Sequence, residues 1–243
     1  MSDLYHNFIF NPIYNFLIFL FNALPWAGAG IIIIILTIVV RLIIFPLSRK
    51  AIHTQVKMAE IAPELEKIKE KYKDKSEEQA KQILSLYKDK KVNPFSGIFV
   101  IIIQIPIIFA LYQIFLKFPE VNKSLLYSFV TAPEYINTNF LGLVDITDKS
   151  IVIALLAGLS TFFQFSISMR NQTPPQGNSF GSNLARNMQL QMKYFLPVIV
   201  FFVSYSISGA IALYWLTNNL FGIGQELVIR KKMRATPRGP AQA

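Results

Sequence analysis

The sequence predicts an all-α polytopic membrane protein with five membrane-spanning helices. Hydrophobic residues make up 53% of the 243 residues and the mean hydropathy is +0.41, which is too apolar for a soluble domain of this length. The apolar residues gather in four blocks, at 27–47, 95–116, 151–169 and 194–229. Because about 20 helical residues cross the hydrocarbon of a bilayer, each of the first three blocks predicts one span.

The fourth block is long enough for two spans. As one helix, its 36 residues would extend about 54 Å, which exceeds a bilayer even when the helix is tilted. Lys193 precedes the block and the basic run 230–232 follows it, and basic residues at both ends favour the same, cytoplasmic side. We therefore expect two short spans, 194–208 and 210–229, joined by a tight turn in which Gly209 relieves the backbone.

These limits divide the whole chain. The predicted spans are 27–47, 94–117, 150–169, 194–208 and 210–229. Between and around them lie an N-terminal segment 1–26, a cytoplasmic segment 48–93, an extracytoplasmic loop 118–149, a cytoplasmic loop 170–193 and a basic cytoplasmic tail 230–243.

Lysine and arginine are concentrated in alternate connections. Segment 48–93 holds 12 basic residues against 8 acidic ones, segment 170–193 holds 3 against none, and segment 226–243 holds 5 against 1. Loop 118–148 holds one lysine and four acids, and segment 1–26 holds a single acid. This alternation predicts an N-terminus outside and a C-terminus in the cytoplasm. The net charge of +10 reflects this asymmetry, so we expect no direct nucleic-acid function.

Segment 1–26 has the pattern of an amphipathic helix. Its asparagines fall on one side of a helical projection: Asn7, Asn11, Asn15 and Asn22. Asn11 followed by Pro12 is typical of an N-cap and a first helical position. We expect a helix in the outer membrane interface; an additional span or a disordered arm are the alternatives.

The cytoplasmic segment 48–93 predicts a helical hairpin. Apolar residues recur at mostly helical spacing on both sides of Pro63, which is expected to kink or restart the helix. Ser76 and Gln79 have capping-box spacing before a second apolar stripe, which places a turn near 74–75. The alternative is a solvated charged connector, but the stripe favours a hairpin that packs on itself, on lipid or on a partner chain.

No residue pattern predicts a catalytic or metal centre. The two histidines, His6 and His53, are expected on opposite sides of the membrane, and the sequence has no Gly-rich phosphate loop. The chain has no cysteine, which excludes a disulfide framework and a thiolate site. We therefore expect neither enzymatic activity nor a cofactor.

Arg41 is the one formal charge expected inside the spans. It lies about 9 Å from the cytoplasmic end of span 27–47, so snorkelling to the headgroups is one interpretation. Thr37 lies one turn deeper on the same face. Every carboxylate is expected outside the apolar interior of the spans, with Glu226 counted in the basic segment 226–243, so no group there would neutralise Arg41.

Polar residues in the other spans are candidate partners for Arg41. They are Gln104, Gln113, Ser160, Thr161, Gln164, Thr217, Asn218, Asn219 and Gln225. Each taken alone fits a helix–helix hydrogen bond. Because an arginine in hydrocarbon costs about 3 kcal/mol or far more, the whole set favours a shared water-filled cavity that would bind an anionic group.

Four stretches carry a recognisable pattern: TIVVRLIIFPLSRKAIHTQVKMAEIAPELEKIKEKY from residue 37, KVNPFSGIFVIIIQIPIIFALYQIF from residue 91, AGLSTFFQF from residue 157, and SGAIALYWLTNNLFGIGQELVIRKK from residue 208. Together, and in this order, they resemble the YidC/Oxa1/Alb3 membrane protein insertases. The resemblance implies a five-helix insertase core around a polar groove that is open to the cytoplasm and to lipid and closed on the outer side.

The resemblance also implies which residues line this groove. They are Arg41, Thr37, Gln104, Gln164, Tyr214, Trp215 and Asn218. Arg41 falls on the groove arginine of the family and Gln104 on the glutamine of its Q-x-P motif. Val100 stands where many members carry a proline, which is expected to alter the local bend of that helix.

The implied function is insertion of proteins into the membrane. Nascent hydrophobic segments would enter the groove and leave laterally into the bilayer, and short outer tails would be translocated. The implied partners are nascent membrane protein clients and membrane lipids, with the ribosome and a Sec-type translocon as further candidates, in a bacterial plasma (inner) membrane. Two other functions stay open: a small-anion carrier that binds its substrate through Arg41, and a chaperone that folds membrane proteins without inserting them.

Overall fold

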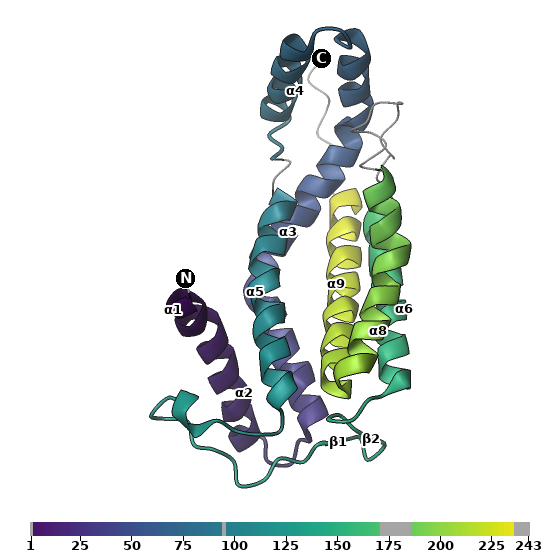
Figure 1. Ribbon diagram of the computed structural model, residues 1–243. Helices are drawn as coiled ribbons and strands as arrows, with labels where there is room; N and C mark the ends of the chain where they lie inside the picture. The colour runs from purple at the N-terminus through teal and green to yellow at the C-terminus, as the bar shows by residue number, and fades with distance from the viewer. Residues whose placement is uncertain (1, 94–95, 171–185, 236–243) are drawn as a thin grey trace.

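The computed structural model describes residues 2–93, 96–170 and 186–235, and most of this chain is helical (Figure 1). The elements are α1 (Ser2–Tyr5), η1 (His6–Phe10), α2 (Asn11–Ala23), α3 (Ala29–Lys71), α4 (Ser76–Asp89), α5 (Ser96–Lys117), η2 (Lys123–Leu125), β1 (Asn139–Phe140), β2 (Val144–Asp145), α6 (Ile151–Met169), η3 (Gln191–Phe195), α8 (Leu196–Ile207) and α9 (Gly209–Ala235).

Long helices lie side by side in a bundle (Figure 1). Within the described residues, three of them are long and apolar enough to cross a membrane: Ala29–Lys71, Ile151–Met169 and Arg186–Ile207, while the apolar helix Ile102–Lys117 is shorter. Helix α9 packs against α3 and α6, α8 packs against α6, and α5 packs against α3. The predicted class of helical membrane protein is confirmed, and spans beyond these three stay a prediction.

The bundle has two different ends (Figure 1). At one end, which we call the loop end, the connection 118–150 crosses the bundle; at the other, the hairpin end, α3 extends beyond its neighbours and α4 folds back beside it. Fully buried apolar side chains lie near the loop end and include Ile32, Ile33 and Leu36 of α3. The main apolar core therefore holds the loop end together.

Helix α3 runs without a break through Pro46 and Pro63 for 43 residues, about 65 Å. Its last turns pack with α4 around a small apolar cluster that contains Ile61 and Leu86. The expected capping box does not form, since Lys75 is the N-cap of α4 and no side chain caps it. Gln79 instead donates to the main-chain oxygen of Lys69, because α4 begins beside the end of α3.

The N-terminal helices contact the loop 118–150 and α5. The chain is already helical from Ser2, so Asn11 is not the N-cap that the sequence indicated. The amide of Asn15 is buried; it donates to the main-chain oxygen of Leu125 at 2.9 Å and accepts from the main-chain nitrogen of Tyr127 at 2.7 Å. The asparagine side of this segment therefore binds protein backbone.

The same loop caps two helices. The main-chain nitrogen of Ala29, at the start of α3, donates to the oxygen of Asn137 at 2.8 Å. At the start of α9, the nitrogens of Gly209 and Ala210 donate to the oxygens of Asp148 and Ile146 at 2.7 and 2.8 Å. A Cβ atom on Gly209 would lie 3.2 Å from the Cα of Ile146. Close approach of the loop, and not only the turn between α8 and α9, therefore explains the glycine.

Asp145 forms several hydrogen bonds within this loop. Its carboxylate accepts hydrogen bonds from the hydroxyls of Thr138 and Thr147, both at 2.6 Å, and from the main-chain nitrogen of Thr147 at 2.9 Å. These bonds, that of Thr138 first, hold the pKa of Asp145 below its ordinary value.

We expect Asp145→Asn to lower the thermal midpoint of the detergent-solubilised protein at neutral pH. Because folding lowers the pKa of Asp145, the charged carboxylate stabilises the folded loop above its unfolded pKa, and this contribution is lost as pH falls through the folded pKa. The difference in midpoint from wild type should therefore shrink below about pH 4. Asp148→Asn is the control, because Asp148 binds α9 through its main-chain oxygen. Equal midpoints for Asp145→Asn and wild type at neutral pH would contradict this role.

Candidate functional site

Arg41 lies where α3 meets α9. Its side chain is only 9% exposed, and its Nη2 donates to the main-chain oxygen of Asn218 at 3.0 Å. Its Nε is buried and has no hydrogen-bond partner among the described residues. A guanidinium has five N–H donors, so this charge is buried with fewer acceptors than it can use. Such a group can bind a further acceptor, above all an anionic one.

Gly222 brings α6 to the same place. A Cβ atom at Gly222 would lie 2.6 Å from Nε2 of Gln164 and 3.6 Å from Nη2 of Arg41. The missing side chain therefore leaves room for the amide of Gln164, next to the guanidinium of Arg41. The structure thus brings together Arg41, Gln164 and Asn218, although Asn218 contributes its main chain, whereas the sequence pattern indicated its side chain.

Thr37 is buried one turn from Arg41 towards the loop end. It is 1% exposed, and its hydroxyl donates to the main-chain oxygen of Ile33 at 2.6 Å, within its own helix. This bond satisfies the hydroxyl donor and leaves its oxygen able to accept. Thr37 is therefore the first buried polar side chain of α3 after the apolar residues near the loop end.

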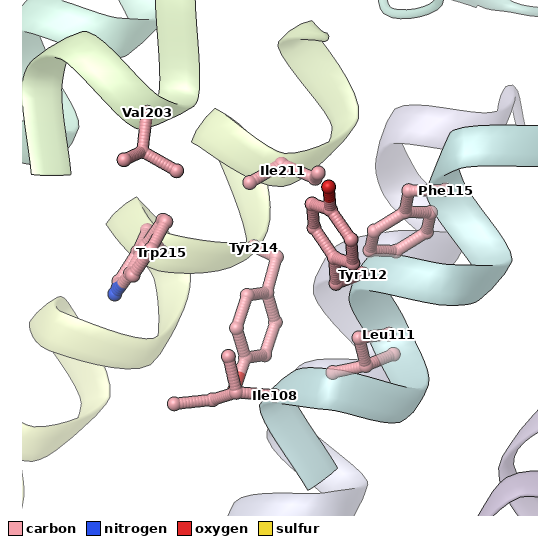
Figure 2. A pocket seen from close by; sticks show the side chains of 8 residues that line it. All are labelled: Ile108, Leu111, Tyr112, Phe115, Val203, Ile211, Tyr214 and Trp215. Atoms are coloured by element: carbon pink, nitrogen blue, oxygen red, sulfur yellow. The ribbon is translucent and has the colours of Figure 1, made fainter. Parts of the chain in front are cut away.

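Gln104 and the aromatic residues lie between α5, α8 and α9. Nε2 of Gln104 donates to the hydroxyl of the buried Tyr214 at 3.0 Å, which joins α5 to α9. Tyr214 and Trp215 also line an apolar cavity of about 40 Å³ (Figure 2). Figure 2 shows Tyr214 projecting towards Ile108 of α5, and Trp215 on the side of Val203 of α8. The polar and apolar parts of the predicted site therefore meet on α9.

Asn219 has a separate role in packing. Its Nδ2 donates to the hydroxyls of Thr161 and Ser160 at 2.7 and 3.0 Å. All three side chains are buried, and both hydroxyls also donate to the main-chain oxygen of Ala157. These residues join α6 to α9 and so match the helix–helix alternative that the sequence left open for them.

The expectation that no carboxylate lies within the spans is wrong for α9. Glu226 is 5% exposed, inside the predicted span 210–229, and its Oε1 accepts from Nη2 of Arg230 at 2.7 Å and from Nε at 2.9 Å. With Glu226 counted in the basic C-terminal segment, the sequence did not predict this pair. In the structure, α9 continues as a helix to Ala235 and includes both residues. The described partner of Glu226 is thus Arg230, and Arg41 bonds to the backbone.

A regular spacing of polar residues in the sequence, on which none of the sequence-based expectations rested, predicts this polar interface. Arg41, Ser48 and Gln55 are seven residues apart on α3, and Asn218 and Gln225 are seven apart on α9. Each of the three α3 residues bonds to an α9 residue 175 to 177 positions later in the chain, and Gln225 donates to the hydroxyl of Ser48 at 2.6 Å. Because the sequence separation between bonded residues is nearly constant, α3 and α9 run parallel. Seven-residue spacing is typical of the contact between parallel helices.

Most of the polar residues around Arg41 are buried in the part of the chain that the structure describes, and Gln164 is partly buried. Arg41, Asn218 and Gln225 are each less than 10% exposed. The described residues also contain no group of three or more histidine or acidic side chains that could hold a metal ion. Because Nε of Arg41 has no partner among the described residues, Arg41 can bind a further acceptor group there.

Comparison with known proteins gives one consistent result. The family model described as 60Kd inner membrane protein matches residues 19–236. Proteins named membrane protein insertase YidC from Francisella tularensis subsp. novicida (strain U112) and from Francisella tularensis subsp. tularensis (strain SCHU S4) are each 33% identical over 207 residues, which cover 85% of this chain and 33% of each relative. The chain spans about a third of the length of these curated relatives.

We expect Asn219→Ala to destabilise the protein by about 1–2 kcal/mol, because it removes the bonds from α9 to two hydroxyls of α6. Asn218→Ala is the matched control, since the main-chain oxygen that binds Arg41 is retained. Thermal unfolding in one detergent should therefore give a lower midpoint for Asn219→Ala than for Asn218→Ala. The reverse order would show that the side chain of Asn218 carries the interface.

Proposed function

This chain belongs to the YidC/Oxa1 family of inner membrane proteins, and from this membership and the site around Arg41 we propose that it inserts other proteins into a bacterial plasma membrane. The observation that carries the proposal is the buried guanidinium, whose Nε has no partner among the described residues, where α3, α6 and α9 meet. Clients would be nascent membrane proteins with a hydrophobic segment and a short acidic outer tail.

The proposed topology has five spans, formed by the first part of α3 and by α5, α6, α8 and α9. The loop end would face outwards and the hairpin end would face the cytoplasm, as the distribution of lysine and arginine indicates. The charged surface of the α3–α4 hairpin would receive clients first. The ribosome and a Sec-type translocon are candidate partners on this side.

Electrostatic attraction to Arg41 would lower the barrier for the tail. A carboxylate at the centre of a bilayer costs about 2.5–3.5 kcal/mol on insertion scales. A pair of opposite charges 4 Å apart is worth about 1 kcal/mol in water and about 4 kcal/mol at an effective dielectric constant of 20. A partly hydrated groove would lie between these limits, so Arg41 would offset much of the cost without trapping the client.

The apolar part of the client would leave through the side of the bundle. The cavity between α5, α8 and α9 supports this route, because its lining is apolar and Tyr214 connects it to Gln104. Burial of the hydrophobic segment in lipid would drive release, so the bundle itself would need neither ATP nor an ion gradient.

We expect Arg41→Ala to slow insertion of a single-span client with an acidic outer tail by about tenfold or more, since about 1.4 kcal/mol of barrier corresponds to a factor of ten. Arg41→Lys should retain most of the activity, because it keeps the positive charge. The measurement is protease protection of the client tail in liposomes that contain the purified protein.

Two controls make this test specific. Arg49→Ala removes an exposed arginine from the same helix and should leave insertion unchanged. A client whose outer acids are replaced by amides should depend little on Arg41. Equal insertion of the acidic client by wild type and Arg41→Ala would exclude the charge mechanism. Failure of wild type beside an active control insertase would contradict the function itself and favour the carrier or the chaperone.

A further inference from the structure

A second polar cluster joins three helices at the hairpin end. It consists of Gln55 of α3, Ser168 of α6, and Glu226 and Arg230 of α9, and we call these four residues the latch. Nε2 of Gln55 donates to the hydroxyl of Ser168 at 3.1 Å. Nη2 of Arg230 donates to the main-chain oxygen of Ser168 at 2.9 Å and to Oε1 of Gln55 at 3.5 Å, while Glu226 binds the guanidinium from its own helix.

Arg230 holds the end of α6. Helix α6 ends at Met169, so the oxygen of Ser168 belongs to its last turn, where main-chain oxygens lack partners within the helix. A cation at a helix C-terminus is also favoured by the helix dipole. The side chains of Arg230 and Glu226 are only 10% and 6% exposed, so both charges are withdrawn from water. Arg230 thus fixes the position of α6 relative to α9 and α3.

The latch lies over the polar layer of the site. Ser48 and Gln225 are one seven-residue step below Gln55 along the parallel helices, and Arg41 lies one step further. Ser48 is 7% exposed. Water that entered along the α3–α9 contact from the hairpin end would therefore meet the latch before it could reach Ser48 and Arg41.

The two ends of the bundle differ in what must be broken to part the helices. Near the loop end, Ile32 and Leu36 belong to a continuous apolar core. Exposing them to water costs free energy that no new bond offsets. The bonds by which the latch residues join α3, α6 and α9 are hydrogen bonds, and water can replace these partners when the helices part. Breaking these bonds therefore costs less than exposing the apolar core near the loop end.

We propose that Gln55, Ser168, Glu226 and Arg230 form a latch that closes the polar layer around Arg41, and that its release opens this layer to the cytoplasm. The proposal deepens the proposed function, since the released state is the one that would admit a client tail. Closure of the polar layer can nevertheless be measured without any client.

The test measures how fast a water-soluble, charged thiol reagent labels a cysteine introduced below the latch. The chain has no cysteine, and Ser48→Cys is a small change at a buried position. In this background we compare Arg230→Ala and the milder Gln55→Ala with Lys231→Ala, which removes a neighbouring exposed cation. A second reporter, Ser204→Cys, is a buried serine in the last turn of α8, towards the loop end and away from the latch.

We expect Ser48→Cys to label about tenfold faster with Arg230→Ala, the change that 1.4 kcal/mol makes in an opening equilibrium, and by a smaller factor with Gln55→Ala. Lys231→Ala should label at the parental rate, and Ser204→Cys should be unaffected by any of the three. Parental rates with both latch variants would overturn the proposal. So would equal acceleration at both reporters, which would indicate general loosening. If Arg230→Ala does not fold, the result for Gln55→Ala decides.

A reversible crosslink connects the latch to insertion. Gln55→Cys and Ser168→Cys, joined by a short reducible bis-thiol reagent, should prevent insertion of the acidic client, and reduction should restore it. Asn22→Cys with Thr131→Cys, crosslinked at the loop end, is the matched control and should insert throughout, since α2 and the loop are already hydrogen-bonded there. Insertion with the latch crosslinked would overturn the proposal. Loss of insertion in wild type itself would instead refute the proposed function, and the labelling rates would still decide the latch.

Discussion

The guanidinium of Arg41 must find acceptors inside a bundle whose helices have already used almost all of theirs. Main-chain oxygens in the middle of a helix accept from the residue four positions later, so Arg41 has to share the oxygen of Asn218 with the α9 helix itself. Sharing is possible only if α3 and α9 lie close together, and the absence of a side chain at Gly222 leaves room beside them for the Gln164 amide of α6. The separation of these helices, and the place of α6 beside them, therefore depend on burying one charge.

The same constraint explains why the bundle changes character along its length. Towards the loop end, α3 contributes Ile32, Ile33 and Leu36 to a fully buried apolar core, and the loop binds the first nitrogens of α3 and α9. From Arg41 onwards, the α3–α9 contacts made by Ser48 and Gln55 are polar. Apolar burial, which is expensive to reverse, thus dominates near the loop end, and hydrogen bonds that water can replace are added towards the hairpin end.

The sequence predicts the helices well because length and hydropathy are local properties. The boundary between α8 and α9 falls at Ser208, within the turn expected from the basic residues at both ends of one long apolar block. Arg41 and Gln164 both lie next to Gly222 of α9, and their shared role in a groove stays a prediction. Partners are harder to predict, because they depend on how each helix is rotated against its neighbours. Asn15 binds loop backbone and Arg230 binds the main-chain oxygen of Ser168 in α6, and neither contact follows from composition or from the amphipathic pattern of a single helix.

Weak acceptors suit a site that must release what it binds. A carboxylate that formed a full ion pair with Arg41 would already satisfy the charge, and a client acid would have to displace it. Arg41 instead bonds to a neutral oxygen, which exerts less attraction on a guanidinium than a carboxylate does. A client acid would therefore gain free energy on arrival, but only the difference between the two acceptors, so binding would stay moderate. Glu226 performs the opposite task at the latch, where a charged partner keeps Arg230 in place until the helices part.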